Sequence, residues 1–167
     1  ETWQDGNYDK FATYMEAGAT EILNGWNISK DAEVLDIGCG SGQTAIPASR
    51  DGLKVTGIDI AENLIEYARE RAQFENLAVH FDVGDVADLP YNNNQFDVVI
   101  SLIGAMFAPD YKKTASEMAR VCKPGGRLHM ANWTPGGFAA SMFKCVAGYA
   151  PPPPGVESPA LWGIEEK

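Results

Sequence analysis

Three aspartates in this chain each follow a short apolar segment, where a carboxylate can accept hydrogen bonds from a ligand. They are Asp36, Asp59 and Asp85. An ionised carboxylate accepts hydrogen bonds only, and its two oxygens can take both hydroxyls of a ribose. Asp59 lies about 20 residues beyond a glycine-rich stretch, which is where an acid binds ribose in open α/β sheets. The alternative is that Asp59 only caps the helix that follows it.

Glycine occurs at every second position after Ile37, at Gly38, Gly40 and Gly42. Without a side chain the backbone can turn tightly, and a ligand can approach the main chain closely. The spacing G-x-G-x-G is not the dinucleotide fingerprint G-x-G-x-x-G. The carboxylate of Asp36 before this loop would repel a phosphate and suits a cation. The stretch therefore predicts a ligand-binding loop, but not one for a pyrophosphate.

A sheet is needed to bring these residues together. Apolar segments of strand length alternate with stretches of helical periodicity. We expect strands at residues 33–37, 54–59, 79–83, 96–101 and 127–131. We expect helices at residues 10–26, 43–50, 62–74, 111–121 and 138–150, the second of them starting late or kinking at Pro47. This alternation predicts an α/β fold with a Rossmann-like, doubly wound, mostly parallel sheet and helices on both faces.

Helical spacing also predicts which side chains face the core. In the first helix these are Phe11, Met15, Gly18, Ile22 and Trp26. In the last helix, Phe143 and Val146 should face inward. The charged run Arg69, Glu70 and Arg71 should form the solvated face of the third helix.

Size and composition restrict the classes of function. The chain has 167 residues, which is one domain by length, and 45% of them are hydrophobic, enough for a packed core. A formal charge of −10 argues against a nucleic-acid partner, because the phosphate backbone would be repelled. No apolar run is long enough to span a membrane. Three widely spaced cysteines, Cys39, Cys122 and Cys145, are expected to be reduced thiols of a cytoplasmic protein.

The sequence shows no catalytic base, so the catalytic residues stay unassigned. His80 and His129 both fall in expected strands, where a lone histidine is usually a structural residue. No Ser-His-Asp set and no metal-ligand cluster has a recognisable spacing, so we expect no metal site.

Two segments resemble a known family. Residues 34–42 read VLDIGCGSG and resemble motif I of the class I S-adenosylmethionine-dependent methyltransferases. Residues 120–128 read RVCKPGGRL and resemble the family segment RVLKPGGRL. The resemblance covers residues 8–138 and is strongest to the small-molecule (type 11) methyltransferases that resemble those of quinone biosynthesis. It implies S-adenosylmethionine as cofactor, S-adenosylhomocysteine as product, and in-line transfer of a methyl group to an oxygen, nitrogen, carbon or sulfur atom of a small molecule.

The resemblance also gives roles to individual residues. Asp59 matches the acid that binds the ribose, while Asp85 and Val86 match the acid and apolar residue that contact adenine. Ser101 and Leu102 would border the methionine part of the cofactor. The implied cofactor contacts are Asp36, Gly38, Cys39, Gly40, Asp59, Ile60, Asp85, Val86, Ser101 and Leu102. The candidates for the acceptor pocket are Tyr8, Met106, Phe107 and Trp133, of which Met106 and Phe107 fit an ordinary core position equally well.

The expected organisation is a single domain in three parts. Residues 1–30 form a helical lid segment, residues 31–137 the cofactor-binding core, and residues 138–167 a helix with a proline-rich rim. Members of the family continue with two more strands, whereas nothing after Thr134 has the alternation of a strand pair. We therefore expect a C-terminally truncated domain of low activity, and a homodimer formed through the free edge of the fifth strand.

Two other functions stay open at this point. A protein that binds S-adenosylmethionine without catalysis, or an interaction module, would share the glycine loop and would bind without transferring a methyl group. A nicotinamide-dependent reductase would share the sheet and Asp59. It would need the longer glycine motif and a Tyr-Lys or Cys/His proton donor, which this sequence lacks.

Overall fold

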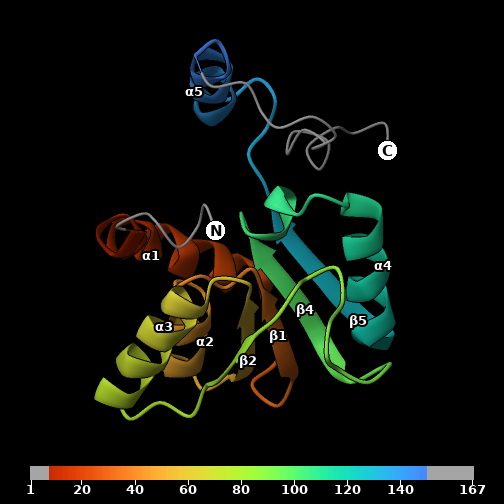
Figure 1. Ribbon diagram of the computed structural model, residues 1–167. Helices are drawn as coiled ribbons and strands as arrows, with labels where there is room; N and C mark the ends of the chain where they lie inside the picture. Colours follow the sequence, from red (N-terminus) through yellow and green to blue (C-terminus); the bar gives the residue numbers. More distant parts are fainter. Residues whose placement is uncertain (1–7, 150–167) are drawn as a thin grey trace.

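The fold is a five-stranded parallel sheet with helices on both faces, as the sequence predicts (Figure 1). The computed structural model describes residues 8–149, with side chains from Tyr14 onward. The strands are β1 Glu33–Ile37, β2 Lys54–Asp59, β3 His80–Val83, β4 Phe96–Leu102 and β5 Cys122–Ala131. The helices are α1 Tyr8–Trp26, α2 Ala45–Arg50, α3 Glu62–Phe74, the 3-10 turn η1 Ala105–Phe107, α4 Tyr111–Val121 and α5 Phe138–Ala147. Helix α1 begins at Tyr8, two residues before the expected start at residue 10, and the proline-rich rim lies outside the described residues.

The strand order β3-β2-β1-β4-β5 places β1 at the centre of the sheet. The chain winds outward from β1 in one direction through β2 and β3, and then returns to the other side of β1 with β4. In such sheets the reversal point, here between β1 and β4, is where ligands bind beyond the carboxyl ends of the strands. The topology therefore brings the glycine-rich loop after β1 to the expected position.

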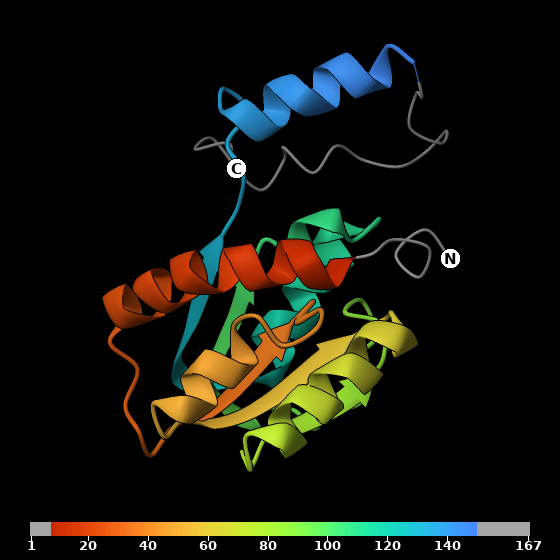
Figure 2. The ribbon, with the colours of Figure 1, turned by 90° about the vertical axis from the view of Figure 1, so that its left-hand side faces the viewer.

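Two apolar clusters pack against the two faces of the sheet. Figures 1 and 2 show α1, α2 and α3 over one face and α4 over the other. Val34 packs in the cluster under α2 and α3, whereas Leu35 and Ile37 pack in the cluster on the opposite face with Met118 of α4. This alternation follows from the two-residue period of a strand. Because both faces are covered, the side chains of β1 are buried everywhere except at Glu33.

Most element boundaries agree with the sequence-based expectation, and the start of β5 is the main exception. Helix α2 begins at Ala45, which fits the expected late start before Pro47. The fifth strand begins at Cys122 and not at Arg127, because Cys122 already pairs with Phe96 of β4. An irregularity in the pairing then absorbs the Pro-Gly-Gly turn, where Gly125 has a φ of 80°.

The packed face of α1 agrees with the expected one only in part. Trp26 packs against the core cluster as expected. Gly18 and Ile22 are exposed, whereas Ala19 and Leu23 are buried. Glu16, which forms ion pairs with α2 and α3, shares this helix face with Ala19 and Leu23. The described helices are all too short or too polar to cross a membrane.

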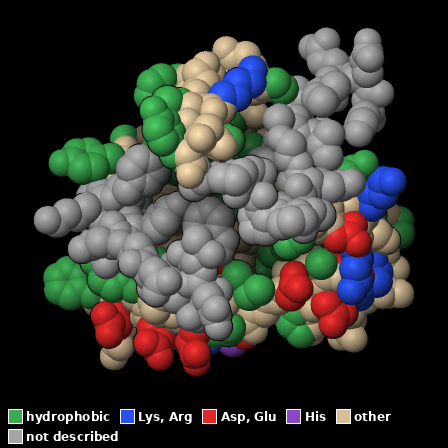
Figure 3. Space-filling model, turned by 45° about the horizontal axis from the view of Figure 1, so that its top comes forward, with side chains coloured by type: hydrophobic (Ala, Val, Ile, Leu, Met, Phe, Trp, Pro, Cys, Tyr) green, Lys and Arg blue, Asp and Glu red, His purple; other side chains and the backbone are tan. Residues whose placement is uncertain are grey.

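Helix α5 stands apart from the sheet, beyond the carboxyl end of β5 (Figures 1 and 2). The expectation that Phe143 and Val146 face the core is wrong, since 40% and 52% of their surfaces are exposed. The linker after β5 carries α5 away from the sheet, so that Ala139 is its only buried residue. Figure 3 shows the exposed hydrophobic side chains of this helix at the top of the view. The ring of Phe143 does contact that of Phe107, at a centroid distance of 6.2 Å.

Candidate functional site

The loop after β1 needs glycine at three positions. Gly38, Gly40 and Gly42 have φ angles of 65°, 53° and 83°, in the left-handed region that L side chains rarely adopt. The loop is tied to the neighbouring strand, because the carbonyl of Ile58 accepts hydrogen bonds from the N–H groups of Gly38 and Cys39, at 2.9 and 3.1 Å. The glycines therefore shape a tight loop with its main chain held against β2.

Gly104 makes the closest approach to this loop. A Cβ atom on Gly104 would overlap the carbonyl oxygen of Gly38 and would lie 2.8 Å from its Cα atom. The two backbones are thus in direct contact where the chain leaves β4. The residue before it, Ile103, has a φ of 65°, which is strained for a β-branched side chain. The N–H of Ile103 is held by the carbonyl of Ala131 at 2.8 Å.

Asp59 holds the glycine loop and also the start of α3. One oxygen of its carboxylate accepts a hydrogen bond from the N–H of Gly40 at 2.8 Å, and the other accepts from the N–H of Ala61 at 2.9 Å. Asp59 is not itself the N-cap of α3, which is Ala61, but its carboxylate binds the N–H group of that N-cap residue. Burial raises the pKa of Asp59, and the hydrogen bonds from these backbone groups oppose that shift. Each carboxylate oxygen has a further lone pair with which it can accept from a ligand.

Asp36 is buried beneath the loop with an incomplete set of hydrogen bonds. Its side chain is 1% exposed, and Oδ2 has no partner among the described residues. Burial, followed by the charge of Asp59, raises the pKa of Asp36 to about 8, against a hydrogen bond from the backbone of Ala45. The hydroxyl of Ser41 is likewise buried without a partner in the described part of the chain. Unpaired buried polar atoms are uncommon, and here they fit a polar or cationic ligand.

The third acid lies on the exposed side of the same edge. Asp85 is exposed and accepts a hydrogen bond from the N–H of Ala87 at 2.8 Å, which shapes its turn. Val86 is partly buried against the core. Ile60 and Val83 are 59% and 44% exposed, and Val83 pairs with Asp59 across the two strands. Exposed apolar side chains thus lie at the carboxyl ends of the neighbouring strands β2 and β3, where a flat apolar ligand group could lie.

The side-chain hydroxyl of Ser101 is engaged in two hydrogen bonds within the protein. It is fully buried, its hydroxyl donates to the carbonyl of Ile37 at 3.0 Å, and it accepts from the N–H of Ala105 at 2.9 Å. These bonds join β1, β4 and η1, so the hydroxyl of Ser101 serves the fold in this structure. Leu102 beside it is half-buried.

The expected acceptor residues lie in different environments. Met106 is 3% exposed and occupies a core position, while Phe107 is half-buried. Trp133 is exposed beyond the end of β5. Tyr8 begins α1, but its side chain lies outside the described part of the structure.

Arg69 and Glu70 are exposed, as expected for the solvated face of α3, whereas Arg71 is partly buried with its side chain 20% exposed. Arg69 donates to the carbonyl of Phe81 through Nε at 3.2 Å and Nη2 at 2.5 Å. Arg71 donates through Nη1 to the carbonyl of Ser41 in the glycine loop at 2.7 Å, and it forms an ion pair with Glu16. Periodicity could not reveal these roles, because the partners are distant in sequence and most are backbone carbonyls.

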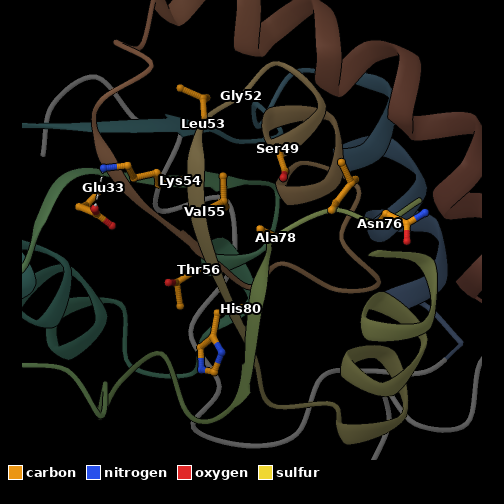
Figure 4. A pocket seen from close by; sticks show the side chains of 11 residues that line it. Glu33, Ser49, Gly52, Leu53, Lys54, Val55, Thr56, Asn76, Ala78 and His80 are labelled. Atoms are coloured by element: carbon orange, nitrogen blue, oxygen red, sulfur yellow. Dashed lines mark ion pairs between the residues drawn. The ribbon is translucent and has the colours of Figure 1, made fainter. Parts of the chain in front are cut away.

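Among the side chains that the structure describes, the two histidines lie away from this edge. His80 bonds Asp82 at 2.9 Å, and the ring of His129 stacks on Trp26 at a centroid distance of 5.2 Å. Within residues 8–149, no three His, Cys, Asp or Glu side chains are grouped to hold a metal. Figure 4 shows a hollow of about 460 Å³ lined in part by Lys54 and Thr56. It lies toward the amino ends of the strands, so it does not belong with the strand-end acids.

Comparison with known proteins identifies the family. Residues 34–126, more than half of the chain, match a family model described as a methyltransferase domain. An uncharacterized protein of Mycobacterium tuberculosis is 36% identical over 166 residues, covering 98% of this chain and 61% of that protein. Methyltransferase GfsG of Streptomyces halstedii is 35% identical over 134 residues, covering 78% of this chain and 48% of the relative.

A solved structure shares both the fold and the sequence pattern. A SAM-dependent methyltransferase of Methanosarcina mazei superposes with a TM-score of 0.66 at 26% identity, covering 76% of this chain and 64% of that chain. The chain therefore spans less than two thirds of each of these three proteins. The range matched by the family model contains the glycine loop, the three strand-end acids and Gly104. On this evidence the chain belongs to the class I S-adenosylmethionine-dependent methyltransferases.

Proposed function

We propose that the edge formed by β1, β2 and β3 binds S-adenosylmethionine, and that the protein transfers its methyl group to a small-molecule acceptor. The observation that carries the proposal is the buried carboxyl of Asp36, whose Oδ2 has no partner among the described residues, directly beneath the left-handed glycine loop. A cation above it would favour the ionised form of Asp36 and would supply the missing interaction. The formal charge of −10 supports a small acceptor over a nucleic acid.

The cofactor would supply a methyl group already activated by a positively charged sulfur. The chain then has to position the two reactants and exclude water. Asp59 would accept from the ribose hydroxyls, Asp85 would accept from the adenine amine, and Ile60 and Val86 would pack against the ring. Gly38, Cys39 and Gly40 would offer backbone close to the methionine part, together with the backbone of Ser101 and Leu102. Phe107 and Trp133 would border the acceptor, with Tyr8 covering it and Met106 supporting Phe107 from the core.

The test is a calorimetric titration of the chain with S-adenosylhomocysteine, NAD and NADP. We expect binding of the first only. Asp59→Ala should weaken it about ten- to a hundredfold, because each lost hydrogen bond to a charged acceptor is worth about 1.5–3 kcal/mol. Asp88→Ala, which removes an exposed acid outside the proposed contacts, is the control and should bind like the parent. Binding of NAD in preference, or undiminished affinity of Asp59→Ala, would contradict the proposed site.

Turnover is a separate question from binding. The chain spans 61% of the mycobacterial relative, and we expect slow methyl transfer from this segment alone. Tight binding without transfer by either the chain or a longer protein that contains it would favour a non-catalytic binding role.

We propose that the chain forms a homodimer in which a second copy pairs with the free edge of β5. Among the described residues, β5 pairs only with β4, so its other side offers N–H and C=O groups to a partner strand. Light scattering at micromolar concentration should give the mass of a dimer. A monomer whose β5 amides exchange rapidly would exclude this pairing.

We also propose that the protein is cytoplasmic, in keeping with three cysteines that form no disulfide.

A further inference from the structure

Four charged side chains join α1, α2 and α3 into one network. Arg50 of α2 forms a two-fold hydrogen bond with Glu75, the C-cap residue of α3, with both distances at 2.6 Å. Arg50 also pairs with Glu16 of α1, and Glu16 pairs in turn with Arg71 of α3. The side chains of Glu16 and Arg71 are 18% and 20% exposed, less than those of Arg50 and Glu75. The Glu16–Arg71 pair is therefore the better shielded from solvent, where ion pairs are screened less.

Arg71 differs from Arg50 because it also reaches the glycine loop. Its Nη1 donates to the carbonyl of Ser41 at 2.7 Å, while Nη2 pairs with Glu16. Ser41 is fully buried between Gly40 and Gly42. One planar guanidinium thus links the loop main chain to α1, and its fixed fork geometry ties the positions of the two partners together.

A loop with glycine at alternate positions has much backbone freedom to lose when it binds a ligand. A bond that already holds the loop in its final shape reduces this loss and tightens binding. Arg71 provides such a bond from outside the loop. Its other partner, Glu16, belongs to the helix that begins with the proposed lid residue Tyr8.

We propose that Arg71 is a positioning residue of the glycine loop, and that through Glu16 it couples the docking of α1 to the affinity for the cofactor. The proposal rests on the proposed function. Coupling between two sites is reciprocal, so cofactor binding should also hold α1 more firmly against α2 and α3. The stability of α1 docking would therefore depend on whether the loop has bound the cofactor, although α1 is not part of the loop.

The test compares three variants by calorimetry with S-adenosylhomocysteine and by thermal unfolding. Arg71→Met removes both bonds, and we expect about tenfold weaker binding, within the usual range of coupling between sites. Glu16→Gln keeps the bond to Ser41 but weakens the link to α1, so it should have a smaller effect on affinity. The matched control is Glu75→Gln, which weakens the Arg50–Glu75 pair and leaves Arg71 in place. It should lower the melting temperature and leave the affinity unchanged.

Hydrogen exchange of the ligand-free protein separates this proposal from the proposed function. Amides of residues 38–42 should exchange faster in Arg71→Met than in the parent or in Glu75→Gln. A lower melting temperature with unchanged affinity and unchanged loop exchange would make Arg71 merely structural. Additive effects of Glu16→Gln and Arg71→Met in the double variant would remove the coupling to α1. If the parent fails to bind S-adenosylhomocysteine, the proposed function fails, and the exchange rates alone decide whether Arg71 holds the loop.

Discussion

Replacing Gly104 by alanine should lower the free energy of unfolding by about 3 kcal/mol, the upper end of the usual cost of overpacking, and abolish cofactor binding. The new Cβ would overlap the carbonyl oxygen of Gly38 and lie 2.8 Å from its Cα. Both atoms belong to backbone and cannot rotate away. Either β4 and η1 separate from β1, or the glycine loop moves. For a domain of this size the melting temperature should fall by about 6–12 °C.

Gly18→Ala is the matched control for this prediction. It makes the same chemical change at a glycine in α1 where nothing lies within 4 Å of the new Cβ. Alanine is the better helix former, so this variant should be as stable as the parent or more stable by about 0.5–1 kcal/mol. Thermal unfolding and titration with S-adenosylhomocysteine measure both variants. If Gly104→Ala has the stability and the affinity of the parent, the contact between Gly38 and Gly104 contributes to neither.

Asp36→Asn should remove a large part of the pH dependence of stability. The pKa of Asp36 is raised to about 8 in the folded protein by burial and then by the charge of Asp59. Between about pH 4 and pH 8 the folded chain therefore holds a proton that the unfolded chain has lost. Raising the pH across that window should lower the free energy of unfolding by about 1.4 kcal/mol per unit from this group. From about pH 5 to about pH 8, the variant should gain about 4 kcal/mol of stability relative to the parent.

Urea unfolding at several pH values measures this effect. Asp59, whose pKa is raised in the same direction, remains in the variant, so a smaller slope should persist. Asp51→Asn removes one exposed carboxylate at the end of α2 and controls for the loss of a charge. Equal pH profiles for the parent and Asp36→Asn would mean that Asp36 is ionised in the folded protein.

Local sequence signals were sufficient for most of the fold. The bounds of β2, α3 and α4 agree with the expectation, because turn residues and hydrophobic period mark these elements within a few positions. The start of β5 could not be predicted in this way. Pro124 and its two glycines indicate a turn, but pairing of Cys122 with Phe96 extends the strand through it. Tertiary pairing therefore overrides the local signal at that point.

The candidate site was predictable in its location but not in its internal bonding. Asp36, Asp59 and Asp85 do lie at the carboxyl edge, since that follows from parallel strands. The close contact between Gly104 and Gly38 could not be predicted, because hydrophobic periodicity does not indicate it. The ion pairs of Glu16 could not be predicted either, because its partners lie 34 and 55 residues away.

The strand order has a consequence for how the chain assembles. Val34 of β1 pairs with Val55 of β2 and also with Val98 of β4, which is about three times as far along the chain. Closing the longer loop costs more chain entropy, and contacts of low sequence separation form faster. The pairing of β1, β2 and β3 can therefore form before β4 pairs with β1. The contact between Gly38 and Gly104 belongs to the later step, so the ligand loop reaches its final shape only when the two halves of the sheet join.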